Sequence, residues 1–127
     1  MIHVEMFQDM GRGVVASQDI PKGMIIAECE ILVLSEIDTP IVNSTDLQWY
    51  TFVYSKTQDC LVLGLGEIFN HSDTPQVQYQ IESINGREKM VFRSTSEIQK
   101  GSQIFISYNQ DCLIVDASNY LINLIGA

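Results

Sequence analysis

The sequence predicts a mainly β domain with few short helices, and three observations support this fold class. Short apolar runs are separated by Gly, Pro, Asn and Asp, the residues that end strands and form turns. Apolar and polar residues alternate along Val77–Ile81, as in a half-buried strand. Asn85-Gly86 is the dipeptide most typical of a two-residue hairpin turn. The chain of 127 residues has the length of one domain with one hydrophobic core.

The predicted strands begin near the N-terminus and follow one another at short intervals. Gly11-Arg12-Gly13 marks a break before a strand at Val14–Ala16. Pro21-Lys22-Gly23 then turns the chain into a strand over Met24–Glu30, which continues through the apolar run Ile31–Leu34.

The second half of the chain repeats this pattern. Val77–Ile81 is predicted to pair across Asn85-Gly86 with a return strand over Lys89–Arg93. Ile104–Ile106 follows as a further buried strand.

A short repeat supports the same fold class. Asp19–Ile25 and Glu97–Ile104 each contain an acidic residue, Ile, one variable residue, Lys and Gly before a strand. Glycine permits positive φ after the charged tip of a turn. The repeat therefore predicts turn-rich β-structure and no particular chemistry.

Helical patterns are few. Ser44-Thr45-Asp46 can cap a short helix that runs through Leu47, Tyr50 and Tyr54. This segment is the only helix that the sequence predicts before the C-terminal region.

The C-terminal segment Leu113–Ile125 has apolar residues at the spacing of one helix face, which predicts a C-terminal helix. An exposed apolar face of that size needs a groove or a partner chain to cover it. We therefore divide the chain into a domain at 1–112 and an apolar tail at 113–127, which packs on the functional cleft or on a partner chain, as in a homodimer.

Composition excludes several classes of protein. Hydrophobic residues make up 46% and charged residues 18%, as in a globular protein. The longest apolar stretches, such as Ile31–Leu34, are too short to span a bilayer, and Met1–Glu5 has no signal-peptide pattern. We expect no membrane contact and an intracellular location.

Sixteen acidic and seven basic residues give a net charge of −9. Such a surface disfavours direct binding of nucleic acid and favours encounter with basic peptides. Plain solubility is an equally simple explanation of the charge. Cys29, Cys60 and Cys112 are far apart and form no C-x-x-C pair, which argues against a disulfide framework or a structural zinc site.

Three segments combine residues that could carry chemistry: Gly11–Ala16, Gly64–Pro75 and Ile104–Asn109. Each has a structural explanation when taken alone: a plain turn, a turn with internal hydrogen bonds, and a strand that ends in a hydrogen-bonded tyrosine. No metal site is predicted, because only His3 could join His71 as a histidine ligand. A serine hydrolase is poorly supported, because no G-x-S-x-G motif occurs.

Taken together and in this order, the three segments resemble the SET-domain family of protein-lysine methyltransferases. The resemblance runs from Val4 to Asp111, and its most specific part is Asn70-His71-Ser72 followed by the strand-terminal Tyr108. In size and pattern the chain looks most like the minimal viral SET proteins that methylate histone tails. The resemblance implies a β-clip-like fold of small curved sheets, with a pseudo-knot near the active site.

The resemblance also implies S-adenosylmethionine as cofactor, with S-adenosylhomocysteine as product. By position, the backbone of Gly11, Arg12 and Gly13 would hold the methionine end of the cofactor. Asn70, through its side chain, and His71, largely through its backbone, would hold its other polar groups.

Four further positions are implied in catalysis and in the substrate channel. Tyr108 would be the catalytic tyrosine, and Tyr50 and Tyr54 are candidates for lining the channel. Ile106 occupies a position where the family can carry an aromatic residue that influences how many methyl groups are added.

The chain also departs from the family pattern. Gln76 follows Pro75 where many relatives carry Asn, so a hydrogen bond made there can shift. Only Cys112 follows Tyr108, so the zinc-binding cysteine cluster that closes the lysine channel in many relatives is absent. The tail at 113–127 is the candidate to close the channel instead.

The leading hypothesis is therefore an S-adenosylmethionine-dependent protein-lysine N-methyltransferase that acts on a basic, histone-like peptide of chromatin. The alternative is a catalytically silent SET-like module that binds a peptide or protein partner. A third interpretation is a β-rich domain that matches the family by fold alone, which would not license a function. Cytoplasmic, nuclear and host-nuclear locations are not distinguished, because no basic import signal is present.

Overall fold

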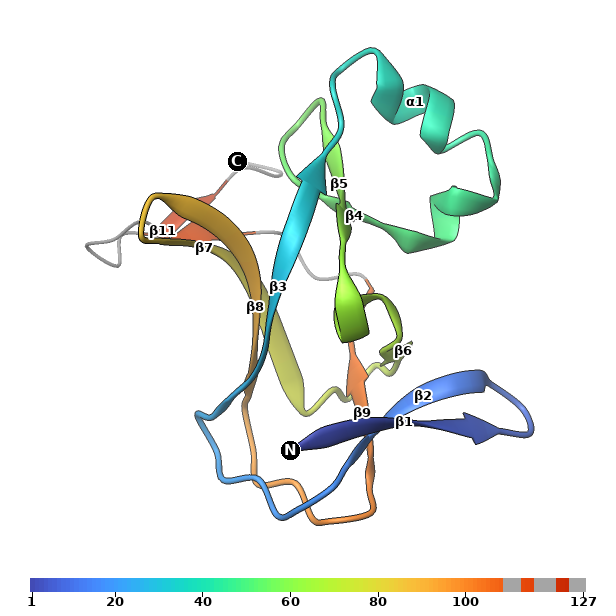
Figure 1. Ribbon diagram of the computed structural model, residues 1–127, viewed down its shortest axis with the longest axis vertical. Coiled ribbons are helices and arrows are strands. Elements are labelled where there is room, and N and C mark those ends of the chain that lie inside the picture. The colour runs from blue at the N-terminus through green and yellow to red at the C-terminus, as the bar shows by residue number, and fades with distance from the viewer. Residues whose placement is uncertain (109–112, 116–120, 124–127) are drawn as a thin grey trace.

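The computed structural model describes residues 1–108, 113–115 and 121–123. Within this part of the chain, strands form a four-stranded and a seven-stranded sheet, and helices are short. Figure 1 shows the smaller sheet below the larger one, with α1 (Asp38–Val42) at the opposite end of the molecule. The predicted mainly β fold class is confirmed.

The smaller sheet has the strand order β1-β2-β9-β6. Its strands are β1 (Ile2–Phe7), β2 (Gly11–Ala16), β9 (Gln103–Ile106) and β6 (Asn70–His71). β2 pairs antiparallel with β9, and β6 pairs parallel with β9, which places Asn70 opposite Phe105. Parallel strands require a long connection. This pairing brings together the three segments that the sequence marks as chemically interesting.

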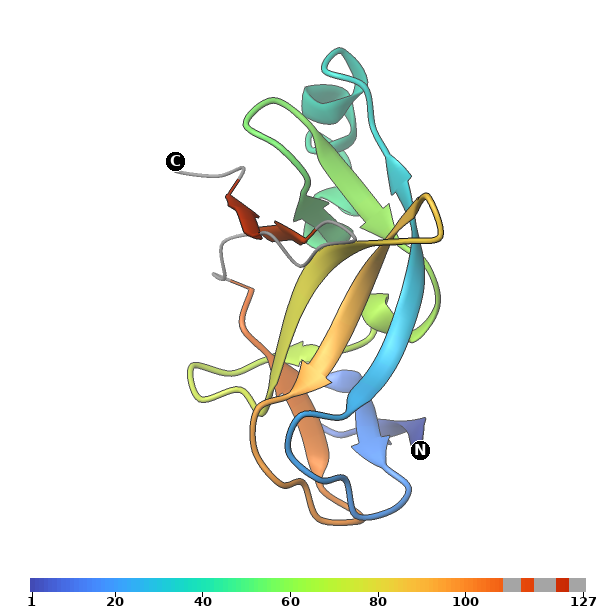
Figure 2. The same ribbon diagram turned by 90° about the vertical axis from the view of Figure 1, so that its left-hand side faces the viewer.

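The larger sheet has the strand order β11-β10-β7-β8-β3-β5-β4. Its strands in chain order are β3 (Ile25–Val33), β4 (Thr51–Val53), β5 (Asp59–Val62), β7 (Val77–Ile84), β8 (Arg87–Ser94), β10 (Leu113–Val115) and β11 (Leu121–Asn123). Figure 2 shows β7, β8 and β3 curving side by side. The hairpin predicted between β7 and β8 is confirmed: Asn85 has φ 52° and Gly86 has φ 78°, as a type I′ turn requires.

One core joins the two sheets. It contains Val14 and Ile104 from the smaller sheet together with Ile81 and Phe92 from the larger one, all fully buried. The ring of Phe69, one residue before β6, stacks on Phe92 with ring centroids 5.0 Å apart. The segment that leads into Asn70 is therefore anchored in the core by an aromatic contact.

The two copies of the sequence repeat contact each other. Ile20 and Ile98 form an isolated antiparallel bridge, with reciprocal backbone hydrogen bonds of 2.8 and 2.9 Å. Gly23 and Gly101, which end the two copies, have φ values of 85° and 88°. The predicted turns are confirmed, and the repeat has a structural role in holding the two sheets together.

The helix predicted after Ser44 is shorter than expected. Thr45 accepts a hydrogen bond from the backbone N–H of Leu47 and caps the 3-10 helix η1 (Asp46–Tyr50). The helix ends at Tyr50, because the next residues form β4 and pair with β5. Tyr54 therefore lies beyond the helix. The helix α1 was not predicted from the sequence.

The C-terminal helix predicted over Leu113–Ile125 is not confirmed. Leu113–Val115 and Leu121–Asn123 form strands β10 and β11, and β10 pairs parallel with β7 at Ile81 and Glu82. The edge of β7 offers backbone groups to β10, and β10 in turn offers its other edge to β11, which favours strands over a helix. The remainder of the predicted helix lies outside the described residues.

Within the part of the chain that the structure describes, no helix has the length and apolar character that a membrane span requires. Cys29 and Cys60 are buried in the core, whereas Cys112 lies outside the described residues.

Candidate active site

A cleft of about 530 Å³ lies where the smaller sheet meets η1 and the 3-10 helix η2 (Gly64–Glu67). It is lined by residues from each of the three marked segments, among them Arg12, Asn70 and Tyr108. Tyr50 from η1 closes another side. The fold thus brings residues that are far apart in the chain into one cavity.

Asn70 connects the strands around the cleft. Its side-chain Nδ2 donates one hydrogen bond to the backbone oxygen of Arg12 and another to Oε1 of Gln103, each 2.9 Å long. Because both N–H groups are engaged, the side-chain oxygen is the atom left to accept a hydrogen bond from a ligand. The orientation of Asn70 is therefore fixed by β2 and β9 before any ligand binds.

His71 uses its side chain to hold the chain after β9. Nδ1 accepts a hydrogen bond of 2.9 Å from the backbone N–H of Tyr108. Nε2 must then carry the proton, which it donates to Oδ1 of Asp73 at 3.0 Å. His71 is not among the described residues that line the cleft, so its side chain positions Tyr108 from outside the cavity.

Tyr108 lines the cleft, and a hydrogen bond fixes its hydroxyl. The hydroxyl donates a hydrogen bond of 2.6 Å to the backbone oxygen of Phe69. Burial is the main cause that raises the pKa of Tyr108, and the neighbouring Tyr50 and Glu67 raise it further. The hydroxyl therefore stays protonated at neutral pH, and its oxygen lone pairs remain available to a ligand.

Gln76 holds β9 in place. Its Nε2 donates to the backbone oxygen of Gln103 at 3.2 Å, and its Oε1 accepts from the backbone N–H of Phe105 at 3.0 Å. The side-chain amide thus extends the hydrogen-bond ladder of the sheet. The departure from asparagine at this position supports the strand that leads to Tyr108.

Gly11 and Gly13 are each needed as glycine, for different structural reasons. Gly11 has φ 72°, and a Cβ there would meet nothing within 4 Å, so the backbone is open to an approaching ligand. A Cβ at Gly13 would lie 2.5 Å from Oε1 of Gln103 and 2.8 Å from Cε2 of Phe7. Gly13 is therefore needed for close packing against Gln103, the side chain that holds Asn70.

The predicted channel residues divide into two groups. Tyr50 lines the cleft, whereas Tyr54 donates its hydroxyl to Oε1 of Glu88 at 2.6 Å and does not line it. Ile106 is fully buried in the core. Ile106, the last residue of β9, is not among the described residues that line the cleft.

Sequence reasoning missed several residues that line the cleft: Trp49, Phe52, Glu67 and Tyr79. Phe52 and Tyr79 meet edge to face with ring centroids 5.2 Å apart. Tyr79 belongs to the alternating pattern of β7, so burial in the core already explained it. For Glu67, the available signal was an acidic residue inside the otherwise apolar run Gly64–Phe69.

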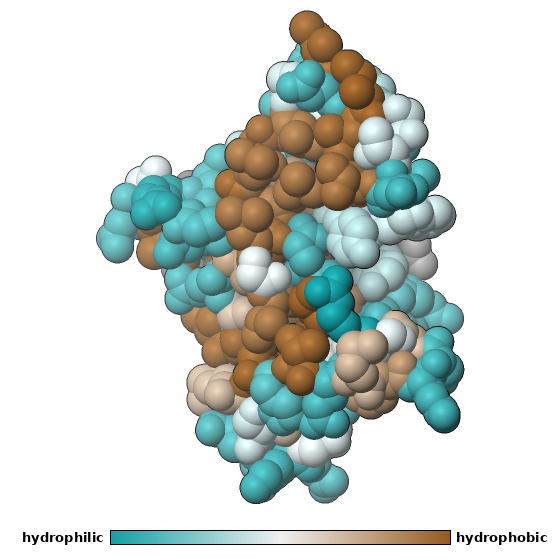
Figure 3. Space-filling view, turned by 45° about the vertical axis from the view of Figure 1, so that its right-hand side comes forward, coloured by the Kyte–Doolittle hydropathy of each residue, from teal (hydrophilic) through white to brown (hydrophobic). Residues whose placement is uncertain are grey.

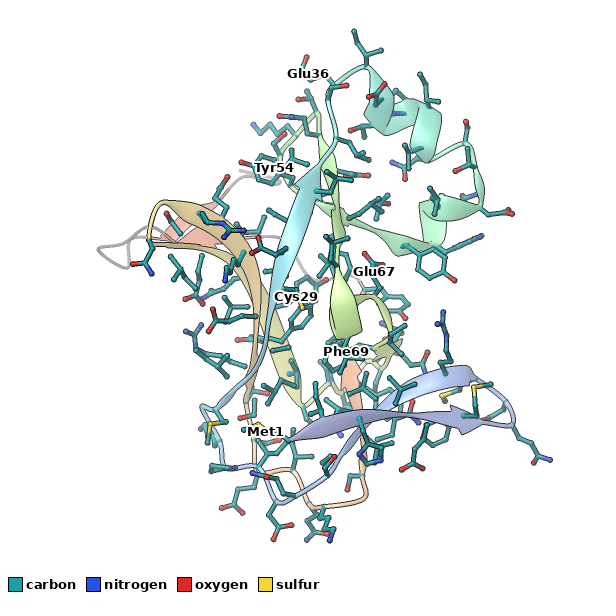
Figure 4. All side chains as sticks on the ribbon, in the orientation of Figure 1. Met1, Cys29, Glu36, Tyr54, Glu67 and Phe69 are labelled. Atoms are coloured by element: carbon teal, nitrogen blue, oxygen red, sulfur yellow. The ribbon has the colours of Figure 1, made fainter. Side chains whose placement is uncertain are left out.

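Glu67 lies at the C-terminal end of η2, and its Oε1 accepts a hydrogen bond of 2.6 Å from the backbone N–H of Val62. Burial raises its pKa from 4.5 to about 7, and the hydrogen bond only partly offsets this. Figure 4 shows Glu67 and Phe69 on the segment that leads from η2 to β6. A Cβ at the preceding Gly66 would lie 2.5 Å from Cγ1 of Val62, so glycine lets this segment approach the core.

The raised pKa of Glu67 makes a prediction about stability. Between about pH 4.5 and pH 7 the folded state binds more protons at Glu67 than the unfolded state does, so the free energy of unfolding falls as pH rises. The shift would correspond to about 3 kcal/mol for a fully buried group, and we discount it to about 1–2 kcal/mol because Glu67 is half-buried. Between pH 4 and pH 8, we expect the free energy of unfolding of Glu67→Gln to increase by about 1–2 kcal/mol relative to that of the native chain.

Denaturant unfolding at a series of pH values measures this difference. Glu30→Gln is the control, since Glu30 does not line the cleft and pairs with Arg87 at 2.5 Å. Parallel pH curves for the native chain and Glu67→Gln would contradict the prediction.

A second, smaller pocket adjoins the cleft. It has a volume of about 320 Å³, and the residues that line it are Leu47, Tyr50, Leu61, Val62, Leu63, Gly64 and Glu67. Tyr50 and Glu67 therefore border both cavities. Figure 3 shows a broad hydrophobic area on one face of the molecule, with hydrophilic side chains around it.

The cleft combines aromatic walls with sparse charge. Of its described lining residues, Arg12 is the only basic and Glu67 the only acidic one. No cluster of three or more His, Cys, Asp or Glu side chains that could hold a metal ion occurs within the described residues. Such a cavity can bind a ligand with both polar and charged groups and enclose an aliphatic amine among aromatic rings.

Comparison with known proteins identifies related chains. The family model described as "SET domain" matches residues 11–109. The Schizosaccharomyces pombe histone-lysine N-methyltransferase that is H3 lysine-37 specific is 30% identical over 110 residues, which cover 86% of this chain and 74% of the relative. The Danio rerio N-lysine methyltransferase KMT5A-A is 26% identical, over 83% of this chain and 34% of the relative.

Solved structures show the same fold. The crystal structure of the Plasmodium falciparum protein PFL0690c has a TM-score of 0.73 at 29% identity and covers 87% of this chain and 98% of that one. A ctPRC2 structure in an autoinhibited conformation bound to S-adenosylmethionine has a TM-score of 0.69 at 19% identity, over 85% of this chain and 15% of that one. At that identity the second likeness concerns the fold alone.

Proposed function

Because this chain belongs to the SET-domain family of protein-lysine methyltransferases, we propose that it transfers a methyl group from S-adenosylmethionine to a lysine of a basic, histone-like protein. The observation that carries the proposal is the convergence of Arg12, Asn70 and Tyr108 on one cleft. These residues come from three segments that the fold joins through the pairing of β2 and β6 with β9.

The residues of the cleft fit the polar end of the proposed cofactor. The open backbone at Gly11 allows a ligand to approach, and the Arg12 guanidinium is the basic group that a carboxylate needs. The side-chain oxygen of Asn70 can accept a hydrogen bond from an ammonium group. When bound, the cofactor supplies a methyl group carried on a positively charged sulfur.

The chain's own residues prepare the lysine. The rings of Phe52, Tyr79 and Tyr50 surround part of the cleft with apolar surface, which disfavours a charged ammonium and lowers its pKa. The Tyr108 hydroxyl is held by the oxygen of Phe69, so its own oxygen can accept a hydrogen bond from the amine and orient it. Orientation of this kind contributes several kcal/mol to catalysis.

The substrate proposal rests on charge and on the relatives. The net charge of −9 favours encounter with a cationic chain, and the S. pombe relative is named for a lysine of histone H3. We propose an intracellular location, in the cytoplasm or nucleus, with the odd number and wide spacing of the cysteines as support.

Two measurements test the proposed function. Calorimetric titration with S-adenosylhomocysteine detects the cofactor site without knowledge of the substrate, and mass spectrometry of recombinant core histones after incubation with S-adenosylmethionine detects transfer. We expect saturable binding and methylated lysine. Folded protein that binds no S-adenosylhomocysteine and methylates no histone would favour the alternative, a silent module that binds a peptide or protein partner.

We also propose that the tail at 113–127 closes the lysine channel or forms a homodimer contact. The basis is the apolar character of its sequence. We expect deletion of 113–127 to weaken S-adenosylhomocysteine binding or to halve the mass measured by light scattering. A truncated chain that folds, binds as tightly and keeps its mass would contradict this proposal.

A further inference from the structure

Glu67 occupies a position that the proposed cofactor site does not explain. It borders both the cleft and the adjoining apolar pocket, together with Tyr50. It is the only acidic side chain among the described residues that line the cleft. Glu67 is a half-buried carboxylate among aromatic and aliphatic side chains. Its position calls for a functional explanation, because burial of an ionised group costs free energy.

The contacts of Glu67 leave part of the carboxylate available. Oε1 accepts the hydrogen bond from the backbone N–H of Val62 at 2.6 Å. Arg12 lines the same cleft, yet the ion pairs found within the described part of the chain do not include Glu67. The carboxylate is therefore held by one neutral donor, and no described cation neutralises it.

Tyrosine and cysteine side chains surround Glu67, and Arg12 lines the same cleft. Tyr50 faces it from η1, Cys29 from β3 and Tyr108 from the end of β9. The carboxylate raises the pKa of both Tyr108 and Cys29, so its field reaches the tyrosine that we place next to the reacting amine. The geometry thus joins a proton acceptor and an orienting hydroxyl in one cavity.

We propose that Glu67 accepts the proton that the substrate lysine must lose before it can be methylated. The inference rests on the proposed function. In this step the N–H bond of the lysine ammonium breaks, its electron pair remains on nitrogen, and an O–H bond forms on the Glu67 carboxylate. The amine is then neutral, and the proton leaves later from Glu67 to water.

The acid–base balance of the cleft favours this transfer. Burial raises the pKa of Glu67 to about 7, which makes it a stronger base than an exposed glutamate while it remains ionised above that pH. The same apolar surroundings lower the pKa of the lysine ammonium, and the two values approach each other. A positioned general base typically contributes about 10²–10⁴-fold in rate.

A purely structural role for Glu67 predicts different behaviour. Its hydrogen bond to the Val62 N–H could serve only to hold η2 against β5. Glu67→Gln separates the two roles, because the amide oxygen can still accept from Val62 whereas the side chain can no longer take a proton at neutral pH.

The experiment measures single-turnover methylation of recombinant core histones from pH 6 to pH 9 by the full chain. We expect the rate of the native chain to rise about tenfold up to a plateau above pH 7, following ionisation of Glu67. Glu67→Gln should be about 10–100-fold slower at pH 7.5 and should rise with pH without that plateau. Glu30→Gln removes the same charge outside the cleft and should match the native chain.

Two further readouts do not depend on turnover. Affinity for S-adenosylhomocysteine should stay within about twofold in Glu67→Gln, which shows that the fold and the cofactor site persist. In a ¹³C-glutamate-labelled chain, the carboxyl resonance that Glu67→Gln removes should titrate near pH 7.

The outcomes are distinct. Native activity with equal rates and pH profiles in Glu67→Gln would overturn the role of Glu67 and leave the proposed function standing. Titration of Glu67 at the ordinary pKa of a glutamate would also overturn it. A native chain that methylates no histone would overturn the proposed function and, with it, this inference.

Discussion

Replacement of Tyr108 by phenylalanine is expected to reduce methyl transfer at least about 100-fold while the chain remains folded. The substitution removes one oxygen atom, which the backbone oxygen of Phe69 holds in the cleft at 2.6 Å. A preorganised polar group at a reacting centre contributes about 3–4 kcal/mol, because no reorganisation is needed when charge moves. The ring stays in place, since the backbone N–H of Tyr108 still donates to Nδ1 of His71.

Single-turnover methylation of recombinant core histones measures this effect, with S-adenosylhomocysteine binding as the test of an intact cofactor site. Tyr54→Phe is the matched control, because that hydroxyl donates to Glu88 and Tyr54 does not line the cleft. Retention of more than about a tenth of the native rate in Tyr108→Phe would rule out the assigned role.

Replacement of Asn70 by alanine is expected to weaken S-adenosylhomocysteine binding about 10–100-fold, or about 1.4–2.8 kcal/mol. Two effects contribute. The ligand loses the side-chain oxygen as an acceptor, and the backbone oxygen of Arg12 and Oε1 of Gln103 lose their common donor. The strands on the two sides of β9 are then no longer joined through a side chain, so the cofactor meets a less ordered site.

Titration calorimetry measures the change in affinity, and thermal unfolding without ligand measures the structural part of it. Gln58→Ala provides the control, because it removes a side-chain amide that donates to the backbone oxygen of Leu34, away from the cleft. Equal affinity in the native chain and Asn70→Ala would contradict the assignment of Asn70 to the cofactor site.

Local sequence patterns identified much of the fold because they depend on neighbours in the chain. Asn85-Gly86 requires positive φ at both residues, and the hairpin forms there. The glycines of the repeat likewise mark the turns at Gly23 and Gly101. Local patterning is ambiguous over Leu113–Ile125, where an apolar spacing that suits a helix also suits two short strands, β10 at the edge of β7 and β11 paired with β10.

The cleft likewise contains some residues that the sequence predicted and others that it missed. Asn70, His71 and Tyr108 were marked by their order and spacing, and the structure brings Asn70 and Tyr108 to one cleft with His71 holding Tyr108 behind it. Tyr79 was assigned to the core, because alternation along β7 cannot distinguish a side chain that fills the core from one that reaches a cavity beside it. Their roles in cofactor binding and catalysis are the subject of the experiments above.

The mainly β class, the positions of the principal turns and the order of the three segments that carry the family resemblance follow from local sequence patterns. Contacts between distant segments set the parallel pairing of β6 with β9, the hydrogen bond from Asn70 to Gln103, and the place of Glu67 at the cleft. The physical reason is the range of the forces involved. Turn and strand preferences act between adjacent residues, whereas burial, and with it the basicity of Glu67, depends on segments that meet only in the folded chain.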